Sequence, residues 1–571
     1  MSEKLPLSSL APEPPRRRRG TAWWSLLPAA LVLIYLHAPS FSSSGGHPDR
    51  GAASASGACR QVDPLLPSLT TAALSDLDRF LDSPKFLNET VARLSGAVQI
   101  PTESFDDYGK VGEDGRWDKM FALSEYLAKT FPRVHAHLKL ERVNTHGLLY
   151  TWQGTDGSLK PTVLMAHQDT VPVAPTTIDS WTHPPFSGAY DGKFVWGRGA
   201  MDCKNSLVGI LESVELLLDA GFEPKRTVVL SFGFDEEISG LRGAGHLGPV
   251  LIDRYGKDGA AIVIDEGAGF DSQWGQNFAL PGTAEKGSID VEIVVRTPGG
   301  HSSIPPPHTG IGILAELITK IEASPYGPEL LSGNPYLGKL QCGAAHAPEF
   351  PSNLRKLLPG DDANVCRRKQ DKLAKEAAKA GPQVKYLFTT SVATDIIGGG
   401  VKINALPERV TVVVDHRVNV GDSTAAVKKH IAEAVRPVAE KYNLTLHAFT
   451  DEAETPSSIT LKQFGDALEP APVTPTSVDG VTPYGILSGT TRALYGEKIV
   501  VSPGIMTGNT DTRYYWDLTK HIFRFLPGYD PESDEWAGIH TVDEKTSVKG
   551  HINLVKWYTT FLRNIDEAQL D

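Results

Sequence analysis

The sequence has no Lys/Arg-rich run beyond its extreme N-terminus, and its formal net charge is −12. A nucleic-acid-binding protein needs a basic surface to meet phosphate, so this composition argues against that class. An internal repeat is also absent. With 571 residues, of which 40% are apolar and 22% charged, the chain has an ordinary globular composition. It is therefore expected to build a large core and not to be disordered or fibrous.

One long apolar run is present at residues 21–38, TAWWSLLPAALVLIYLHA, without Lys, Arg, Asp or Glu. Its 18 residues exceed the core of about 7–15 residues in a cleaved signal peptide and approach the roughly 20 that span a bilayer. Arg16–Arg19 precede the run, which places its leading side in the cytosol. We therefore expect a cytosolic tail at 1–20, a transmembrane signal anchor at 21–38 and the rest outside the cytosol. A cleaved signal peptide and a buried core helix are the alternatives.

Two features downstream of this run fit the secretory pathway. Residues 39–58 are small, polar and rich in Gly and Ser, so we expect a flexible stalk over residues 39–75. The triplets that begin at Asn88 and Asn443 are candidate N-glycosylation sites.

The sequence contains four cysteines. Cys342 and Cys366 are close enough in sequence to close a loop of modest length, which an oxidising lumen would permit. Cys59 and Cys203 have no obvious partner in the sequence. We expect Cys342 and Cys366 to pair, although spacing alone does not fix the pairing.

The chain between residues 161 and 270 alternates strands and helices. Near-continuous apolar strands separated by amphipathic helices are typical of a largely parallel sheet covered by helices on both faces, an α/β fold. The strands are expected at 162–166, 226–234 and 260–265. Residues 286–450 instead read as an α+β domain inserted into the first, with alternating strands such as IDVEIVV. The α/β domain then comprises residues 76–285 and 451–571.

Polar residues follow the expected strands of the α/β domain: His167, Asp169, Asp202, Glu236, Glu237 and Asp265. Each alone has a structural explanation, such as a hydrogen-bonded core histidine or acids at a helix start. Strand ends of a parallel sheet, however, meet at one edge, so these carboxylates would raise one another's pKa values unless a cation is present. Ligands of histidine and carboxylate without thiolate favour zinc, with cobalt or manganese as alternatives.

Seven motifs stand in the order found in M20-type metallopeptidases: MAHQDTVPV, GRGAMDCKNS, FGFDEEISG, VIDEGAG, TPGGHSS, GNTDTRYY and GIHTVDE. The sequence resembles this family over about residues 95–565, and most of all its fungal vacuolar carboxypeptidase S (Gly-X carboxypeptidase) branch. The resemblance implies a two-metal peptidase domain, with an inserted lid/dimerisation domain at 286–450. It also implies two zinc ions per subunit and a homodimer formed through the lid.

The family pattern assigns roles to the residues at the strand ends. By resemblance, His167 and Asp265 bind one metal, Glu237 and His540 bind the other, and Asp202 bridges both. Asp169 resembles the carboxylate that orients the metal-binding histidine. Glu236 resembles the general base that accepts the proton of the attacking water.

Further residues resemble the family's substrate-binding groups. His301 resembles the lid histidine that stabilises the oxyanion, in many relatives from the partner subunit. Asn404 and Arg417 resemble the pair that binds the substrate carboxylate, although a turn residue and a charged strand end would explain them as well. Gly508, Thr510 and Asp511 resemble a loop that lies near the substrate in the family.

Two details concern packing. Cys203 follows Asp202, and helix geometry would turn its side chain about 100° away from that of the bridging carboxylate, so we expect it to pack and not to bind metal. The Pro-, Gly- and Lys-rich segment at 325–395 exceeds a minimal lid.

The resemblance implies a zinc carboxypeptidase that removes C-terminal residues from short peptides, with glycine preferred in the penultimate position. We expect a type II, single-pass protein of the vacuolar membrane with a luminal catalytic domain. An N-acyl amino acid hydrolase or synthase of the same family is the alternative enzyme, because both reactions act on an amide next to a free carboxylate. A catalytically silent membrane glycoprotein is the remaining alternative.

Overall fold

The computed structural model describes residues 59–331, 333–359, 367–533 and 538–570. The expected cytosolic tail, signal anchor and most of the expected stalk lie outside these residues. Within them, no helix combines the length and apolar character needed to cross a bilayer.

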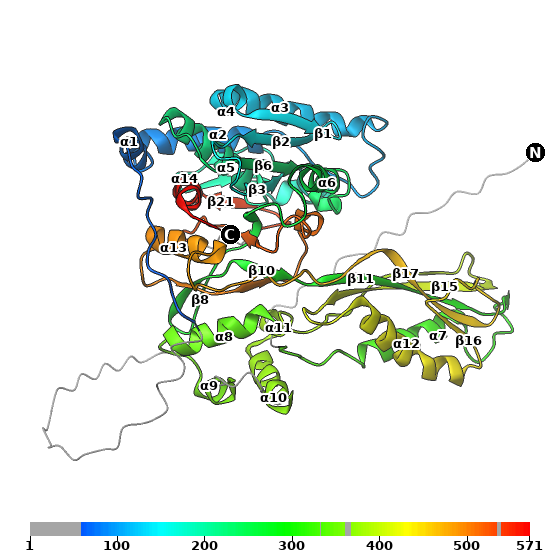
Figure 1. Cartoon of the computed structure of the whole chain (residues 1–571). Coiled ribbons are helices and arrows are strands. Elements are labelled where there is room, and N and C mark those ends of the chain that lie inside the picture. The colour runs from blue at the N-terminus through cyan, green and yellow to red at the C-terminus, as the bar shows by residue number, and fades with distance from the viewer. Residues whose placement is uncertain (1–58, 332, 360–366, 534–537, 571) are drawn as a thin grey trace, which may run out of the picture. The chain divides into compact units, whose positions relative to one another are not determined.

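An eight-stranded mixed sheet forms the centre of the α/β domain (Figure 1). Its central pairs β6–β3, β3–β7 and β7–β20 are parallel, whereas β1, β2 and β10 pair antiparallel with their neighbours β2, β6 and β20. This confirms the expected α/β fold. In spatial order the strands are β1 (Lys139–Val143), β2 (Gly147–Trp152), β6 (Val228–Gly233), β3 (Thr162–His167), β7 (Ile262–Ala268), β20 (Ile522–Phe525), β10 (Gly282–Glu285) and β19 (Gly504–Met506).

Helices cover both faces of this sheet. Alternate residues of each strand point to opposite faces, so Leu164 and Leu230 pack with one set of helices, and Val163 and Val229 pack against α6 (Ala244–Tyr255) on the other. Helix α5 is buried on nearly all sides because it lies between the sheet and α14. The first set comprises α1 (Ala72–Phe80), α2 (Pro84–Val98), α3 (Lys119–Thr130), α4 (Pro132–His137), α5 (Lys204–Asp219), α13 (Pro483–Tyr495) and α14 (Val548–Glu567).

Two small sheets lie beside the main one. They are β4 (Ala189–Tyr190), β5 (Phe194–Trp196) and β21 (Lys545–Ser547), and β8 (Phe270–Gln273), β9 (Gln276–Ala279) and β18 (Val500–Val501). Because β21 pairs with β5, the segment just after His540 is held next to the segment just before Asp202. Residues far apart in the sequence thereby meet.

The inserted domain, called the lid below, contains a five-stranded sheet with α7 (Gly310–Glu322) and α12 (Thr424–Lys441) on one side (Figure 1). Strand β17 pairs with β11 over most of its length, so the lid continues to residue 468 and the expected boundary at 450 is one strand too early. In spatial order the strands are β13 (Ala393–Gly399), β15 (Arg409–Val418), β11 (Gly287–Arg296), β17 (Ser458–Leu468) and β16 (Thr445–Ala448). A two-stranded ribbon of β12 (Gly300–His301) and β14 (Ala405–Leu406) completes it.

The described residues of the segment that exceeds a minimal lid form four α-helices, which share a small core with Phe278 of β9 and Val500 of β18. The helices are α8 (Pro335–His346), α9 (Ser352–Leu357), α10 (Arg367–Ala377) and α11 (Pro382–Lys385). Cys342 on α8 forms a disulfide with Cys59, so the expected pairing with Cys366 is wrong. The two partners are 283 residues apart in sequence, and no spacing rule could have joined them.

The N-terminal segment from Cys59 onward is attached to the α/β domain. The backbone N–H of Leu65 donates to the carbonyl of Gly489 at 2.9 Å, and the side chain of Asn564 donates to the carbonyl of Leu65 at 2.9 Å. The expected stalk over 39–75 therefore ends at or before Cys59, because its last residues are held by hydrogen bonds and a disulfide.

Candidate metal centre

His167 is the last residue of β3 and is buried, with 1% of its surface exposed. Its Nε2 atom lies 3.0 Å from Oδ1 of Asp202 and 3.1 Å from Oε1 of Glu266. Its Nδ1 atom lies 3.0 Å from the carbonyl oxygen of Asp169, which fixes the plane of the ring. One imidazole nitrogen thus faces two carboxylates while the other is held by the backbone.

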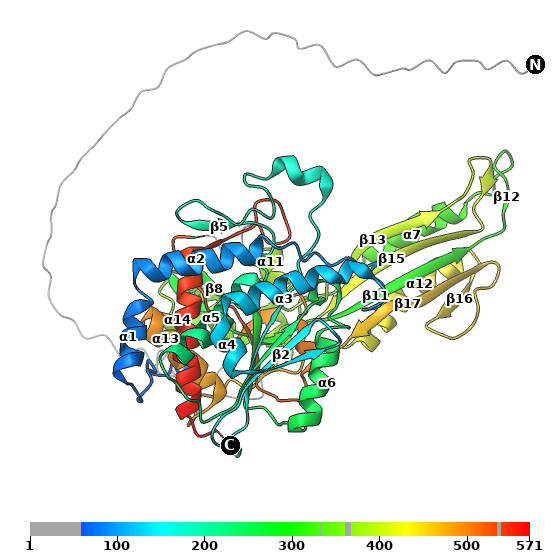
Figure 2. The same cartoon turned by 90° about the horizontal axis from the view of Figure 1, so that it is seen from above.

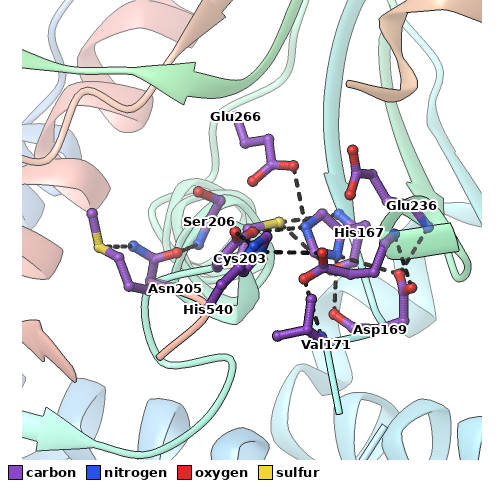
Figure 3. A network of polar contacts seen from close by, with 12 residues as sticks. His167, Asp169, Val171, Cys203, Asn205, Ser206, Glu236, Glu266 and His540 are labelled. Carbon is purple, nitrogen blue, oxygen red and sulfur yellow. Dashed lines mark hydrogen bonds and ion pairs between the residues drawn. The ribbon is translucent and has the colours of Figure 1, made fainter. Parts of the chain in front are cut away.

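Two groups of side chains could each hold a metal ion. Their ligand atoms lie within 4.8 Å of one another inside each group, and Asp202 belongs to both. Oδ1 of Asp202 faces His167, whereas Oδ2 lies 3.1 Å from Nε2 of His540, which is 3.2 Å from Oε2 of Glu237. A carboxylate that turns one oxygen to each group has the geometry of a bridge between two ions. The groups are His167, Asp202, Cys203 and Glu266, and Asp202, Glu237 and His540. Figure 3 labels His167, Cys203, Glu266 and His540 of these.

Glu266, and not the predicted Asp265, faces His167 (Figure 3). The sequence suggested that a strand ends at Asp265, but β7 continues to Ala268. Successive side chains of a strand point to opposite faces, so only one of the two acids can reach the histidine. Asp265 is instead 2% exposed, and its Oδ2 has no hydrogen-bond partner among the described residues.

Cys203 lies closer to the metal-binding groups than expected. Helix α5 begins at Lys204, so the rotation per helical residue does not separate Cys203 from Asp202. The backbone N–H of His167 donates to Sγ of Cys203 at 3.2 Å, and the side chain is 1% exposed. The thiol therefore packs against His167, and its sulfur also lies within ligand distance of the group that contains His167 and Glu266.

Asp169 supports more of the site than the histidine ring. Its Oδ1 accepts the backbone N–H of Glu236 at 3.0 Å, and its Oδ2 accepts the N–H of Glu237 at 3.2 Å and the hydroxyl of Ser104 at 2.6 Å. Oδ1 also lies 3.3 Å from Nδ1 of His167. This carboxylate thus ties the loop after β6 to the end of β3.

Glu544 plays a similar supporting part that sequence reasoning missed. This buried carboxylate accepts the backbone N–H groups of Met201 and Asp202 at 3.0 and 3.1 Å and pairs with Arg198. It belongs to the GIHTVDE motif that also contains His540, and this proximity was the available signal.

The electrostatics of the site favour cations. Burial, together with the nearby charge of Asp202, raises the pKa of Glu266 to about 8, and burial raises that of Asp265 to about 7. Hydrogen bonds to Asp202 and Glu237 raise the pKa of His540 to about 10. Carboxylates crowded in this way carry their full charge only beside positive charge. Histidine and carboxylate donors arranged around a shared aspartate fit two divalent metal ions.

The structure separates the other predicted residues. Figure 2 shows β12, which holds His301, at the end of the lid away from the α/β domain. The ring of His301 is exposed and accepts the N–H of Ser303, and Asn404 lies beside it because its carbonyl accepts the N–H of Ser302 at 3.3 Å. Arg417 is near the opposite end of β15, paired with Ser288. The predicted carboxylate-binding pair is therefore not together within one chain.

The predicted substrate loop lies beside the metal-binding groups. Thr510 and Asp511 are 4% exposed, whereas Gly508 is exposed. Asp511 packs against the glycines that flank the Glu236 loop, since a Cβ on Gly240 would lie 1.9 Å from its Oδ1. Burial and the charges of other acids raise its pKa.

Comparison with known proteins agrees with this geometry. Residues 163–564 match Peptidase family M20/M25/M40. Carboxypeptidase S of Saccharomyces cerevisiae is 42% identical over 89% of either chain. A mouse N-fatty-acyl-amino acid synthase/hydrolase is 33% identical over 83% of this chain and 87% of its own.

A solved M20 family metallo-carboxypeptidase from Sulfolobus solfataricus shares the fold, with a TM-score of 0.56 at 19% identity over 84% of this chain and 99% of that chain. The match to this chain covers 89% and 87% of the length of the yeast and mouse sequence relatives. The family match spans the α/β domain together with the lid. The chain therefore belongs to the M20/M25/M40 peptidase family and is an enzyme of its metallocarboxypeptidase kind.

Proposed function

We propose that the protein is a two-zinc carboxypeptidase that hydrolyses the C-terminal peptide bond of short peptides, with glycine preferred before the bond. The observation that carries this proposal is the pair of ligand groups that share Asp202, with Glu236 on the neighbouring loop near His167 (Figure 3). His167 and Glu266 would hold one ion, Glu237 and His540 the other, and Asp202 both. The similarity to carboxypeptidase S supports the choice of peptides as substrates.

Two bound zinc ions would supply an acidified water and polarise the scissile carbonyl. Glu236 has the role of general base: its carboxylate accepts the proton of that water and passes it to the leaving amine. Burial raises the pKa of Glu236 well above its ordinary value, which favours a group that must both take and return a proton. Asp169 holds the backbone N–H of Glu236 and so keeps the base in place.

Arg417 is the candidate group for the free carboxylate of the substrate, and His301 the candidate donor to the oxyanion. Because His301 and Asn404 lie together at the far end of the lid, we propose that a second copy of the chain delivers both. Exposed apolar residues on the edge strand β13, Ile396 and Ile397, support a homodimer formed through the lid.

Complementation between two inactive variants tests the homodimer. In a mixed dimer of His301→Ala and Arg417→Ala chains, one of the two sites has every group intact. Mixing should therefore restore activity to about a quarter of all sites if chains exchange at random. Failure to recover activity, with mixed dimers demonstrated by two affinity tags, would remove the shared site.

Substrate class is tested by comparing benzyloxycarbonyl-Gly-Leu with an N-fatty-acyl leucine on the purified luminal part. We expect efficient turnover of the peptide, lost after dialysis against a chelator and restored by zinc. The similarity to the mouse N-fatty-acyl-amino acid synthase/hydrolase supports the second candidate function. Turnover of the acyl amino acid alone would select that function instead.

Location follows from the N-terminal sequence and the resemblance: we propose a signal anchor in the vacuolar membrane with a luminal catalytic part. Asn88 and Asn443 are exposed, which fits N-glycosylation at both. Carbonate extraction of membranes tests the anchor, and removal of the mass added at each asparagine by endoglycosidase tests the glycans.

A further inference from the structure

Asn509 joins the lid to the α/β domain next to the metal-binding groups. Its Nδ2 donates to the carbonyl oxygen of Lys286 at 2.5 Å, at the junction between β10 and β11. Its Oδ1 accepts a hydrogen bond from Nη1 of Arg417 at 3.4 Å. The amide therefore contacts the backbone at the start of the lid and the guanidinium proposed to bind the substrate carboxylate.

The loop that carries Asn509 is anchored in the core. The hydroxyl of Thr510 donates to Oε1 of Glu285 at 2.8 Å, and that of Thr512 donates to its Oε2 at 3.0 Å. Glu285 pairs with Arg524 at 2.8 Å, and both side chains are 0% exposed. A buried ion pair whose guanidinium also donates to the hydroxyl of Thr512 resists displacement, because breaking it leaves an uncompensated charge. These contacts therefore hold the backbone of Asn509 in a fixed position.

The other end of the same loop reaches the catalytic residues. Asp511 packs against Gly233 and Gly240, which flank the loop of Glu236 and Glu237. Residues 509–511 thereby span from the Arg417 guanidinium to the base of the metal-binding groups. Any shift of this loop changes the distance between the two.

The remaining contacts engage Nε of Arg417 and leave its Nη2 without a partner among the described residues, so this edge of the guanidinium can bind an anion. The Nε atom lies 3.3 Å from Oδ2 of Asp415 on the same strand. In the described part of the chain, the Arg417 side chain makes one hydrogen bond to the α/β domain, and this bond is to Oδ1 of Asn509. Lys286 does not compete for an anion, because its Nζ donates to the carbonyls of Tyr386 and Thr389 at 3.2 and 2.7 Å. An amide acceptor is neutral, so it orients the guanidinium without cancelling its charge.

We infer that Asn509 is a positioning residue that sets the place of Arg417 relative to the metal-binding groups, and thereby selects substrates whose free α-carboxylate is one residue from the scissile amide. This inference rests on the proposed function, because it takes Arg417 as the carboxylate-binding group. Asn509 itself acts through Arg417 and need not touch the substrate.

The test compares benzyloxycarbonyl-Gly-Leu with its C-terminal amide for the wild type and for Asn509→Ala, Asn509→Asp and Arg417→Ala. The measured quantity is the ratio of kcat/KM for the free acid to that for the amide. We expect Asn509→Ala to lower this ratio about three- to tenfold, the effect of one lost hydrogen bond, mainly through KM of the acid. Asn509→Asp should lower it further, since its carboxylate would pair with Arg417 and compete with substrate. Asn353→Ala, which removes one exposed amide hydrogen bond elsewhere, should leave it unchanged.

The outcomes are distinguishable. If the wild type does not hydrolyse the acid, the proposed function fails. If Arg417→Ala lowers the ratio and both Asn509 variants leave it intact, the inference is wrong and the proposed function stands. If Arg417→Ala has no effect on the ratio, carboxylate binding by Arg417 is wrong and the inference falls with it. Equal losses of kcat on both substrates for the Asn509 variants would mean a general structural role and would also overturn it.

Discussion

Replacing Asp169 by asparagine tests the central support of the site, because the change keeps the shape of the side chain and removes its charge. The carboxylate accepts hydrogen bonds at both oxygens, from the backbone N–H of Glu236 at Oδ1 and from the N–H of Glu237 at Oδ2. An asparagine can accept at only one of them. Its NH2 group must therefore face one backbone N–H.

The less costly orientation follows from the neighbours. With NH2 at the Oδ1 position, the amide would oppose both Glu236 N–H and the ring of His167, which lies 3.3 Å away. With NH2 at the Oδ2 position, it would oppose Glu237 N–H alone, because the hydroxyl of Ser104 can rotate to accept. One buried N–H without a partner costs about 1–3 kcal/mol. An unfolding entropy of about 1 kcal/mol/K for a chain of this size converts this to a Tm lower by roughly 1–3 °C.

We expect activity to suffer more than stability. Outer carboxylates that orient metal ligands typically contribute about 10–100-fold to activity or metal affinity. At saturating zinc, Asp169→Asn should lower kcat by that factor and still contain two ions per chain by mass spectrometry. Ser104→Ala is the matched control, since it removes one hydrogen bond to Asp169 and leaves the charge. A kcat within about twofold of wild type for Asp169→Asn would refute this role, because a 10-fold loss is the smallest that the contacts imply.

Three further outcomes are expected. Glu236→Gln should lower kcat about 10²–10⁴-fold with unchanged zinc content, and substantial residual activity would remove Glu236 as the base. In the chelated protein, the pKa values of Glu266 and His540 are raised to about 8 and about 10. These two groups therefore bind more protons in the folded state than in the unfolded chain above about pH 4.5, where an ordinary glutamate has lost its proton. The free energy of unfolding, and with it Tm, should fall as pH rises from 5 to 8. Zinc should abolish this slope in a thermal-shift assay, and an equal slope with zinc would contradict the metal assignment. Cys342→Ser should free the N-terminal segment and let its backbone enter the trypsin active site, so that cleavage after the already exposed Arg60 becomes faster, which N-terminal sequencing detects. Cleavage equal to wild type would show that hydrogen bonds alone hold the segment.

The sequence predicted the α/β sheet because its central strands are buried on both faces and therefore read as continuous apolar runs. It also named His167, Asp202, Glu237 and His540, which the structure brings together. It named Asp265 where the structure places Glu266, because both residues belong to the motif VIDEGAG. The choice between them depends on where the strand ends. Strand ends are the least certain feature of a sequence-based assignment, and here β7 continues three residues beyond the expected end.

Two other errors have a non-local cause. The pairing of Cys342 with Cys59 depends on the path of the N-terminal segment across the α/β domain, and no local pattern encodes this path. Strand β17 belongs to the lid because it pairs with β11, from which it is separated by most of the inserted domain. Such contacts become visible only once the sheet is assembled.

The separation of Asn404 from Arg417 has the same origin. Asn404 precedes β15 and Arg417 lies near its far end, and the eight residue steps from Arg409 to Arg417 cover about 27 Å at about 3.4 Å per residue. One substrate carboxylate is far smaller than this distance. A sequence spacing of thirteen residues gives no hint of it, since the same spacing in a helix or a loop would permit contact.

The hydrogen bonds of the buried acids separate supports from metal ligands. Asp169 and Glu544 each accept two backbone N–H groups, so their charges are already compensated by fixed donors. Asp202, Glu237 and Glu266 instead each turn at least one oxygen toward the Nε2 atom of a histidine. Asp169, in contrast, faces the Nδ1 atom of His167, which the backbone carbonyl of Asp169 already holds. A carboxylate satisfied by backbone donors gains little from a metal ion, whereas one that faces an imidazole shares with it the position that an ion would occupy. This distinction, which needs backbone coordinates, favours Glu266 as a ligand at the proposed metal centre and Asp169 and Glu544 as supports that hold the site in shape.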